Sequence, residues 1–219
     1  MNSFSFYRRM ILLGILGLSV GLASLQHAQA QQPTQTITER ILIIGDSLSA
    51  EYGLKRGTGW VELLKQSLAK THPSAEIINA SISGDTTSGG VSRIKALLAR
   101  TKPNIVLIEL GANDALRGLP LSLTRNNILE MVRLAKETGA QVLLAGMQIP
   151  PNYGTEYTTA FRELFAQIAQ SEQTGLVPFF LEGIADRPEM FQADTIHPNE
   201  QAQPILMGNV LEKLAPMLR

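Results

Sequence analysis

The chain has no cysteine among its 219 residues. This absence excludes a cysteine nucleophile and a thiolate-bound metal, and it leaves no thiol to carry the lipid of a lipoprotein anchor. Aromatic residues make up only 5% of the chain, so it offers little for stacking against sugars. Basic and acidic residues number 19 each, and this balance gives no support to nucleic-acid binding.

The first thirty residues have the pattern of a cleavable export signal. Arg8 and Arg9 supply a positive end, residues 10–25 form an uncharged apolar run, and Ala-Gln-Ala at 28–30 provides a small-x-small cleavage pattern. An apolar run of 16 residues is short for a bilayer span, which needs about 20 residues. Cleavage is therefore favoured over an uncleaved membrane anchor.

These features predict the organisation of the chain. Residues 1–30 are expected to be a signal peptide cut after Ala30, followed by a loose polar lead-in at 31–40. Residues 41–219 remain for one domain, because hydrophobic residues at 44% suffice for one core and the length is too short for two. The mature protein is expected to be periplasmic or secreted, with no stable membrane anchor.

Short apolar runs alternate with longer segments of helical periodicity. The runs that predict strands are 41–44, 76–80, 105–110, 141–145 and 176–180, and the segments that predict helices are 60–70, 87–100, 123–138, 155–172 and 201–217. Gly139 is placed to end the helix before it. Five alternations of strand and helix predict a parallel sheet with helices on both faces. Ligands of such sheets bind at the carboxyl ends of the strands.

Four polar clusters follow these predicted strands: GDSLS at 45–49, SISGDT at 81–86, GAND at 111–114 and DTIHPN at 194–199. Serine is a weak nucleophile that needs an adjacent base, and the base needs a carboxylate to orient it. Of the three histidines, His27 lies in the predicted signal and His72 in a surface-like stretch, which leaves His197. Ser47 after the first strand is the favoured nucleophile, with Asp194 as the orienting carboxylate.

An acyl-transfer site also needs hydrogen-bond donors for the developing oxyanion. The backbone N–H groups of Ser47 and Gly84 and the side-chain amide of Asn113 are the candidates. Taken singly, these residues also have structural interpretations: Ser47 could cap a helix, Gly84 could form a turn, and Asn113 could belong to a loop. Ser49 is a second candidate nucleophile by residue type.

The ordered motifs GDSLS, ISGDT, GAND and DTIHPN resemble the GDSL or SGNH hydrolase superfamily, with MQIPPNYG at 147–154 and PFF at 178–180 as further similarities. The surroundings are most similar to the bacterial periplasmic thioesterase I, lysophospholipase L1 and arylesterase group. The resemblance implies a three-layer α/β/α sandwich of flavodoxin-like type with a five-stranded parallel sheet. It also implies the triad Ser47, Asp194 and His197, an oxyanion hole of Ser47, Gly84 and Asn113, and no metal or cofactor.

Two segments are candidate walls of a substrate pocket. Residues 115–120 follow Asn113 and could line or gate an acyl pocket, or could simply connect two elements. The candidate substrate-binding residues are Ala115, Leu116, Leu119, Ile149, Pro150 and Tyr153. Glu51 occupies a position where glycine is usual in the group, so a carboxylate is expected near the mouth of the site.

The sequence therefore predicts a serine hydrolase that acts on a small-molecule acyl ester, acyl thioester or lysophospholipid. Two alternatives stay open. One is a carbohydrate acetyl esterase or O-acetyltransferase, and the other is a non-catalytic binding module built on the same crevice.

Overall fold

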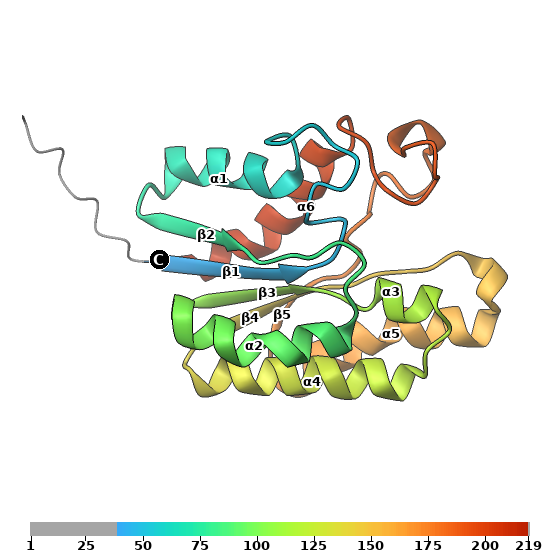
Figure 1. Cartoon of the computed structure of the whole chain (residues 1–219), viewed down its shortest axis with the longest axis horizontal. Coiled ribbons are helices and arrows are strands. Elements are labelled where there is room, and N and C mark those ends of the chain that lie inside the picture. Colours follow the sequence, from blue (N-terminus) through green and yellow to red (C-terminus); the bar gives the residue numbers. More distant parts are fainter. Residues whose placement is uncertain (1–38, 219) are drawn as a thin grey trace, which may run out of the picture. The chain divides into compact units, whose positions relative to one another are not determined.

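A five-stranded parallel sheet forms the centre of the protein in the computed structural model, which describes residues 39–218 (Figure 1). The strands are β1 (Glu39–Gly45), β2 (Ala75–Asn79), β3 (Ile105–Glu109), β4 (Gln141–Ala145) and β5 (Gly175–Val177). Their spatial order is β2-β1-β3-β4-β5, and every neighbouring pair is parallel. The predicted parallel sheet is confirmed. The predicted signal peptide, residues 1–30, lies outside the described residues.

Helices cover both faces of this sheet and complete three layers. The helices are α1 (Trp60–Thr71), α2 (Thr87–Thr101), α3 (Ala112–Leu116), α4 (Leu121–Glu137), α5 (Thr155–Glu172) and α6 (Gln203–Leu214), with single 3₁₀ turns at Pro151–Tyr153, Pro188–Met190 and Ala215–Met217. In Figure 1, α1 and α6 pack on one face, and α2, α4 and α5 pack on the other. The α/β/α sandwich is therefore confirmed. Among the helices of residues 39–218, none is both long enough and apolar enough to cross a membrane.

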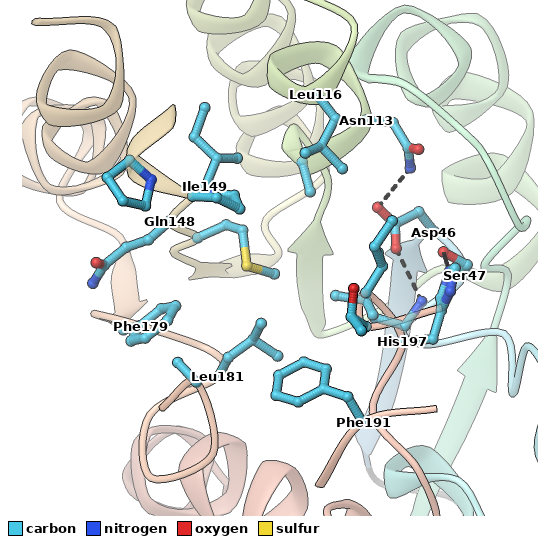
Figure 2. Close-up of a pocket in the computed structure, with 18 residues that line it drawn as sticks. Asp46, Ser47, Asn113, Leu116, Gln148, Ile149, Phe179, Leu181, Phe191 and His197 are labelled. Carbon is cyan, nitrogen blue, oxygen red and sulfur yellow. Dashed lines mark hydrogen bonds between the residues drawn. The ribbon is translucent and has the colours of Figure 1, made fainter. Parts of the chain in front are cut away.

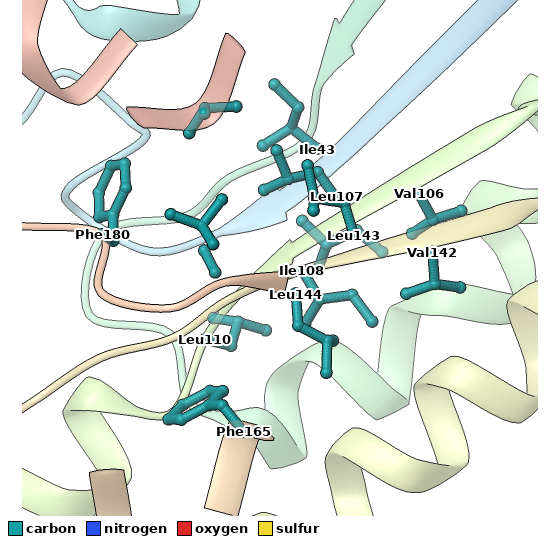
Figure 3. Packing of buried hydrophobic residues seen from close by; sticks show 14 of the residues in the cluster. Ile43, Val106, Leu107, Ile108, Leu110, Val142, Leu143, Leu144, Phe165 and Phe180 are labelled. Atoms are coloured by element: carbon teal, nitrogen blue, oxygen red, sulfur yellow. The ribbon is translucent and has the colours of Figure 1, made fainter. Parts of the chain in front are cut away.

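Burial on both faces explains the composition of the central strands. All five residues of β3 are buried, as are Ile41 to Ile44 of β1, because each face of the sheet is covered by helices. Figure 3 shows Leu107, Leu143 and Leu144 of neighbouring strands packed together, with Phe165 of α5 below them. This apolar layer holds the central strands in place, and so fixes the positions of the loops that follow them.

The order of the strands locates the crevice. The chain passes from β1 outward to β2, and then crosses back over β1 to β3 on its other side. Connections that leave adjacent strands in opposite directions open a crevice at their carboxyl ends. In this sheet the crevice lies where β1 and β3 end, at Gly45 and Glu109, which are paired in register.

Prolines account for two differences from the sequence prediction. The last strand ends at Val177 rather than Phe180, because Pro178 has no N–H to extend the ladder. Phe180 instead turns into the core and packs edge-on against Trp60, with ring centroids 5.5 Å apart. The last helix begins at Gln203 because Pro204 is tolerated only in a first turn.

Candidate active site

The loop after β1 presents Ser47 at the crevice. The strand ends at Gly45, and the Ser47 hydroxyl lies 2.9 Å from Nε2 of His197 (Figure 2). The two residues are 150 positions apart in the chain, so only the fold brings them together. An imidazole nitrogen at this distance can accept the serine proton.

A short loop before α6 carries both His197 and Asp194. Nδ1 of His197 lies 2.7 Å from Oδ2 of Asp194, and Oδ1 of Asp194 accepts from the backbone N–H groups of His197 and Ile196 at 3.0 Å each. Chiefly through the His197 N–H bond, these contacts lower the pKa of Asp194 to about 2. The carboxylate is therefore charged at neutral pH and holds the imidazole in one orientation.

The three candidate oxyanion donors each have a hydrogen to spare. The N–H groups of Ser47 and Gly84 donate to no acceptor within residues 39–218. The Asn113 amide donates one hydrogen to Oδ2 of Asp46 at 2.9 Å, and its NH₂ group carries a second. Free donors of this kind can stabilise a negative oxygen.

Hydrogen bonds from two elements hold the loop that carries Gly84. The Ile82 N–H donates to the carbonyl of Gly45 at 3.0 Å, which fixes the loop beside the end of β1. Arg117 donates to the Gly84 carbonyl at 2.9 Å. Gly84 has a φ of +76°, a left-handed conformation that favours glycine. Gly84 is exposed and does not line the neighbouring cavity.

A cavity of about 500 Å³ opens beside Ser47 and His197, as Figure 2 shows. Its apolar lining consists of Leu48, Ala112, Leu116, Met147, Ile149, Pro150, Pro151, Phe179, Leu181, Ala185, Phe191 and Ile196. Its polar lining consists of Asp46, Ser47, Asn113, Gln148, Thr195 and His197. Half of the polar lining residues, Ser47, Asn113 and His197, are candidate catalytic residues, and the larger apolar part of the wall is suited to an aliphatic chain.

Half of the predicted substrate-binding residues line this cavity: Leu116, Ile149 and Pro150. The other three lie outside it. Ala115 is fully buried because α3 turns its side chain toward the core. Leu119 and Tyr153 contribute to local hydrogen bonding instead: the Leu119 carbonyl accepts from the Tyr157 hydroxyl, and the Tyr153 hydroxyl donates to the Leu116 carbonyl.

The loop after the nucleophile differs from the sequence expectation at Glu51. The Glu51 carboxylate does not line the cavity but folds back into its own loop, where it accepts from the N–H groups of Gly57 and Gly59 at 2.8–3.2 Å. Glu51 itself has a φ of +58°. Its side chain therefore shapes this loop rather than the substrate pocket.

Two residues that the motifs did not indicate lie against the His197 loop. The ring of Tyr52 packs against the imidazole in a tilted arrangement, with centroids 4.3 Å apart and planes inclined by 36°. The Gln192 side chain donates to the carbonyls of Tyr52 and Pro198, and so ties the nucleophile loop to the His197 loop. Nothing in their sequence context marks them, because neither lies in a strand-end motif.

A pair of buried carboxyl groups lies beneath the nucleophile. Asp46 and Glu109 are 1% and 2% exposed, and the buried Ser49 hydroxyl donates to Glu109 at 2.7 Å. Burial raises the pKa of Asp46 to about 6 and that of Glu109 well above its ordinary value. Within residues 39–218, no group of three or more histidine and acidic side chains is arranged to hold a metal ion.

Comparison with known proteins agrees with this geometry. A family model described as the GDSL-like lipase/acylhydrolase family matches residues 43–204. "Esterase TesA" of Pseudomonas aeruginosa is 48% identical over 184 residues, 84% of this chain and 92% of that protein. "Thioesterase 1/protease 1/lysophospholipase L1" of Escherichia coli K12 is 37% identical over 180 residues, with 82% and 85% covered. The crystal structure of the esterase EstA from Pseudoalteromonas, inhibited by monoethylphosphonate, matches with a TM-score of 0.78 at 40% identity, covering 82% of this chain and 98% of that one.

Proposed function

The chain belongs to the GDSL-like lipase/acylhydrolase family, and we propose that it hydrolyses acyl esters and thioesters through an acyl-enzyme on Ser47. Relatives at 37–48% identity are named esterase and thioesterase/lysophospholipase, which supports this reaction class. The observation that carries the role of Ser47 is the chain of short contacts from its hydroxyl through His197 to Asp194, at 2.9 and 2.7 Å.

The first step is attack of Ser47 on the substrate carbonyl. Asp194 accepts from Nδ1–H of His197, which leaves Nε2 as the basic nitrogen facing the serine. As the Oγ–carbon bond forms, the hydroxyl proton passes to Nε2, and the charge of Asp194 stabilises the imidazolium. The low pKa of Asp194, about 2, keeps this carboxylate ionised at neutral pH.

The tetrahedral intermediate carries a negative oxygen that needs donors. The N–H groups of Ser47 and Gly84 and the second hydrogen of the Asn113 amide are available for it, since the described structure gives them no other acceptor. Each such donor is worth roughly 2.7–4 kcal/mol in the transition state. Asp46 orients the Asn113 amide by accepting its first hydrogen.

Collapse of the intermediate breaks the bond to the leaving alcohol or thiol. His197 returns its proton to that group, and the acyl chain stays on Ser47 as an ester. A water molecule then loses its proton to Nε2 of His197 and attacks the acyl-enzyme. The same donors stabilise the second tetrahedral intermediate. Its collapse breaks the bond between Oγ and the acyl carbon, His197 returns the proton to Oγ of Ser47, and the carboxylic acid is released.

The acyl chain occupies the apolar cavity beside Ser47. Phe179, Leu181 and Phe191 form part of its wall in Figure 2, and twelve of its eighteen lining residues are apolar. This lining favours aliphatic acyl groups over sugars, so the carbohydrate esterase alternative has no observation in its favour. A panel of p-nitrophenyl esters and acyl-CoA thioesters of increasing chain length measures the preference.

The nucleophile is tested with a fluorophosphonate probe, which labels activated serines. The wild-type protein is expected to be labelled and Ser47→Ala to be unlabelled and inactive. Ser92→Ala, which removes an exposed serine of α2, is the matched control and should be labelled like the wild type. Labelling that persists in Ser47→Ala would exclude the proposed role.

We also propose that the protein is exported and cut after Ala30. The charged end, apolar run and Ala-Gln-Ala pattern of residues 1–30 support this, and the first strand begins only at Glu39, so cleavage leaves the fold whole. Mass spectrometry of the protein from a periplasmic fraction should find Gln31 as the first residue. An intact chain beginning at Met1 in the membrane fraction would contradict the proposal.

A further inference from the structure

Glu109 is a buried acid directly beneath the nucleophile loop. It is the last residue of β3, lies opposite Gly45 of β1 and is 2% exposed. Its Oε2 accepts from the Ser49 hydroxyl at 2.7 Å and from the Asp46 N–H at 3.2 Å. A Cβ on Gly45 would come within 2.7 Å of the same oxygen, so a glycine at this position makes room for the carboxyl group.

The neighbouring Asp46 connects this acid to the oxyanion donors. Its Oδ1 accepts from the Leu48 N–H at 3.0 Å, which shapes the loop around Ser47. Its Oδ2 accepts from the Asn113 amide at 2.9 Å, the dashed contact in Figure 2. The direction of the free Asn113 hydrogen therefore depends on where the Asp46 carboxylate is held.

Burial and a neighbouring acid both disfavour the charged form of a carboxyl group, so one negative charge on this pair is favoured over two at neutral pH. Neither forms an ion pair with a lysine or arginine within residues 39–218. His197 and Asp85 act on Asp46 from a distance with opposite signs, and Glu109 faces Asp46 and Ser49. Burial and the Asp46 charge raise the pKa of Glu109, whereas the Leu48 N–H and the Asn113 amide donate to the Asp46 carboxylate and favour its charged form, so we assign the proton to Glu109.

We propose that Glu109 is a positioning residue that works as a neutral carboxylic acid, donating its proton to the Asp46 carboxylate while accepting from Ser49 and the Asp46 N–H. The inference rests on the proposed function, because the Asn113 amide that Asp46 orients is the oxyanion donor. The proton also keeps a second negative charge away from a site where negative charge develops. Neither the motifs nor the triad assigns Glu109 a role.

Substitution of Glu109 by glutamine and by methionine distinguishes this positioning role from a packing role. Glu109→Gln keeps one acceptor and replaces the acid O–H by an N–H donor, so its kcat should stay within about threefold of wild type. Glu109→Met fills similar space without hydrogen bonds, so its kcat should fall at least about tenfold at nearly constant KM, because the Asn113 donor is misplaced. Glu163→Met, at an exposed glutamate of α5, is the control for the substitution itself.

The protonation state is read directly by infrared difference spectroscopy at pH 8, where Asp46 is ionised. Wild type minus Glu109→Gln should show the carbonyl stretch of a protonated carboxylic acid. Absence of that band, or a loss of kcat in Glu109→Gln as large as in Glu109→Met, overturns the proposal, because Glu109 would then act as an anion. The band and the glutamine variant decide the question even if Glu109→Met does not fold. Failure of the wild type to react with a fluorophosphonate would instead indicate that the proposed function is wrong.

Discussion

Replacing Asp46 by asparagine should make the protein more stable at neutral pH and less active. Burial raises the pKa of Asp46 from 3.8 to about 6, although the hydrogen bonds from Leu48 and Asn113 act to lower it. A raised acid pKa means that folding favours the protonated form. The protonated Asp46 side chain therefore contributes its full share of the unfolding free energy below pH 3.8. That contribution is lost as the pH rises through the folded-state pKa of about 6.

The size of the effect follows from the shift. A shift of about two pKa units corresponds to about 3 kcal/mol, at 1.36 kcal/mol for each unit. At pH 7 the ionised Asp46 side chain therefore lowers the unfolding free energy of the wild type by about 3 kcal/mol. Asparagine avoids this charge, but its NH₂ group replaces one of the two oxygens that accept from Leu48 and Asn113, which offsets about 1 kcal/mol of the gain. With a net gain of about 2 kcal/mol and a urea m-value of about 1–3 kcal/mol/M, the unfolding midpoint of Asp46→Asn should lie about 0.7 to 2 M above that of wild type.

Urea unfolding at pH 7 and pH 4 provides the assay. At pH 4 the wild-type side chain is largely protonated when folded, so the advantage of Asp46→Asn in unfolding free energy should fall by about 2.5 kcal/mol relative to pH 7. Asp186→Asn, at an exposed aspartate, is the control and should change little at either pH. Meanwhile kcat should fall about tenfold or more, because the Asn113 amide loses its charged acceptor. Equal stability of the two proteins at pH 7, or a difference that persists unchanged at pH 4, would refute the reasoning.

Three further variants test the remaining parts of the site. Asn113→Ala should lower kcat on the order of 10²–10³-fold in a p-nitrophenyl ester assay with the fold intact by circular dichroism; a change confined to KM would contradict an oxyanion role. Tyr52→Ala should lower kcat about 2- to 5-fold, since the ring that faces the imidazolium is lost, whereas Tyr52→Phe should match wild type; equal losses in both would point to the hydroxyl. Leu181→Trp should narrow the cavity. If this excludes three methylenes of the acyl chain at about 0.8 kcal/mol each, kcat/KM for long acyl esters should fall on the order of 50-fold while that for short esters is unchanged. Equal losses for short and long esters would mean that the acyl chain binds outside this cavity.

The sheet could be predicted because both of its faces are buried. Apolar runs such as Ile41 to Ile44 carry a strong strand signal when no residue faces solvent. The ends of elements were less certain, since they depend on single residues: the last strand stops at Pro178, and the last helix starts beside Pro204. Helix α3 was not predicted, because its five residues are too few to show a helical period.

The site residues could be named from their places after the strands, and the fold brings Ser47, Asp194 and His197 within hydrogen-bond distance. Side-chain direction could not be predicted in the same way. The carboxylate of Glu51 was expected at the mouth of the site, but it satisfies the backbone of its own loop. Tyr52 reaches His197 only through that loop conformation, which sequence spacing does not encode.

The two aspartates of the site show why residue type alone does not set a role. Asp194 lies in a half-exposed loop and accepts from two backbone N–H groups, so its charge is favoured and available to orient His197. Asp46 lies buried beside a second acid, so its charge is costly and survives only because Glu109 keeps the shared proton and because Leu48 and Asn113 donate to it. Selection for stability alone would remove the charge of Asp46. Its presence beneath the nucleophile is therefore best explained by its hydrogen bond to the Asn113 amide, and a more stable variant without this charge is expected to be a slower enzyme.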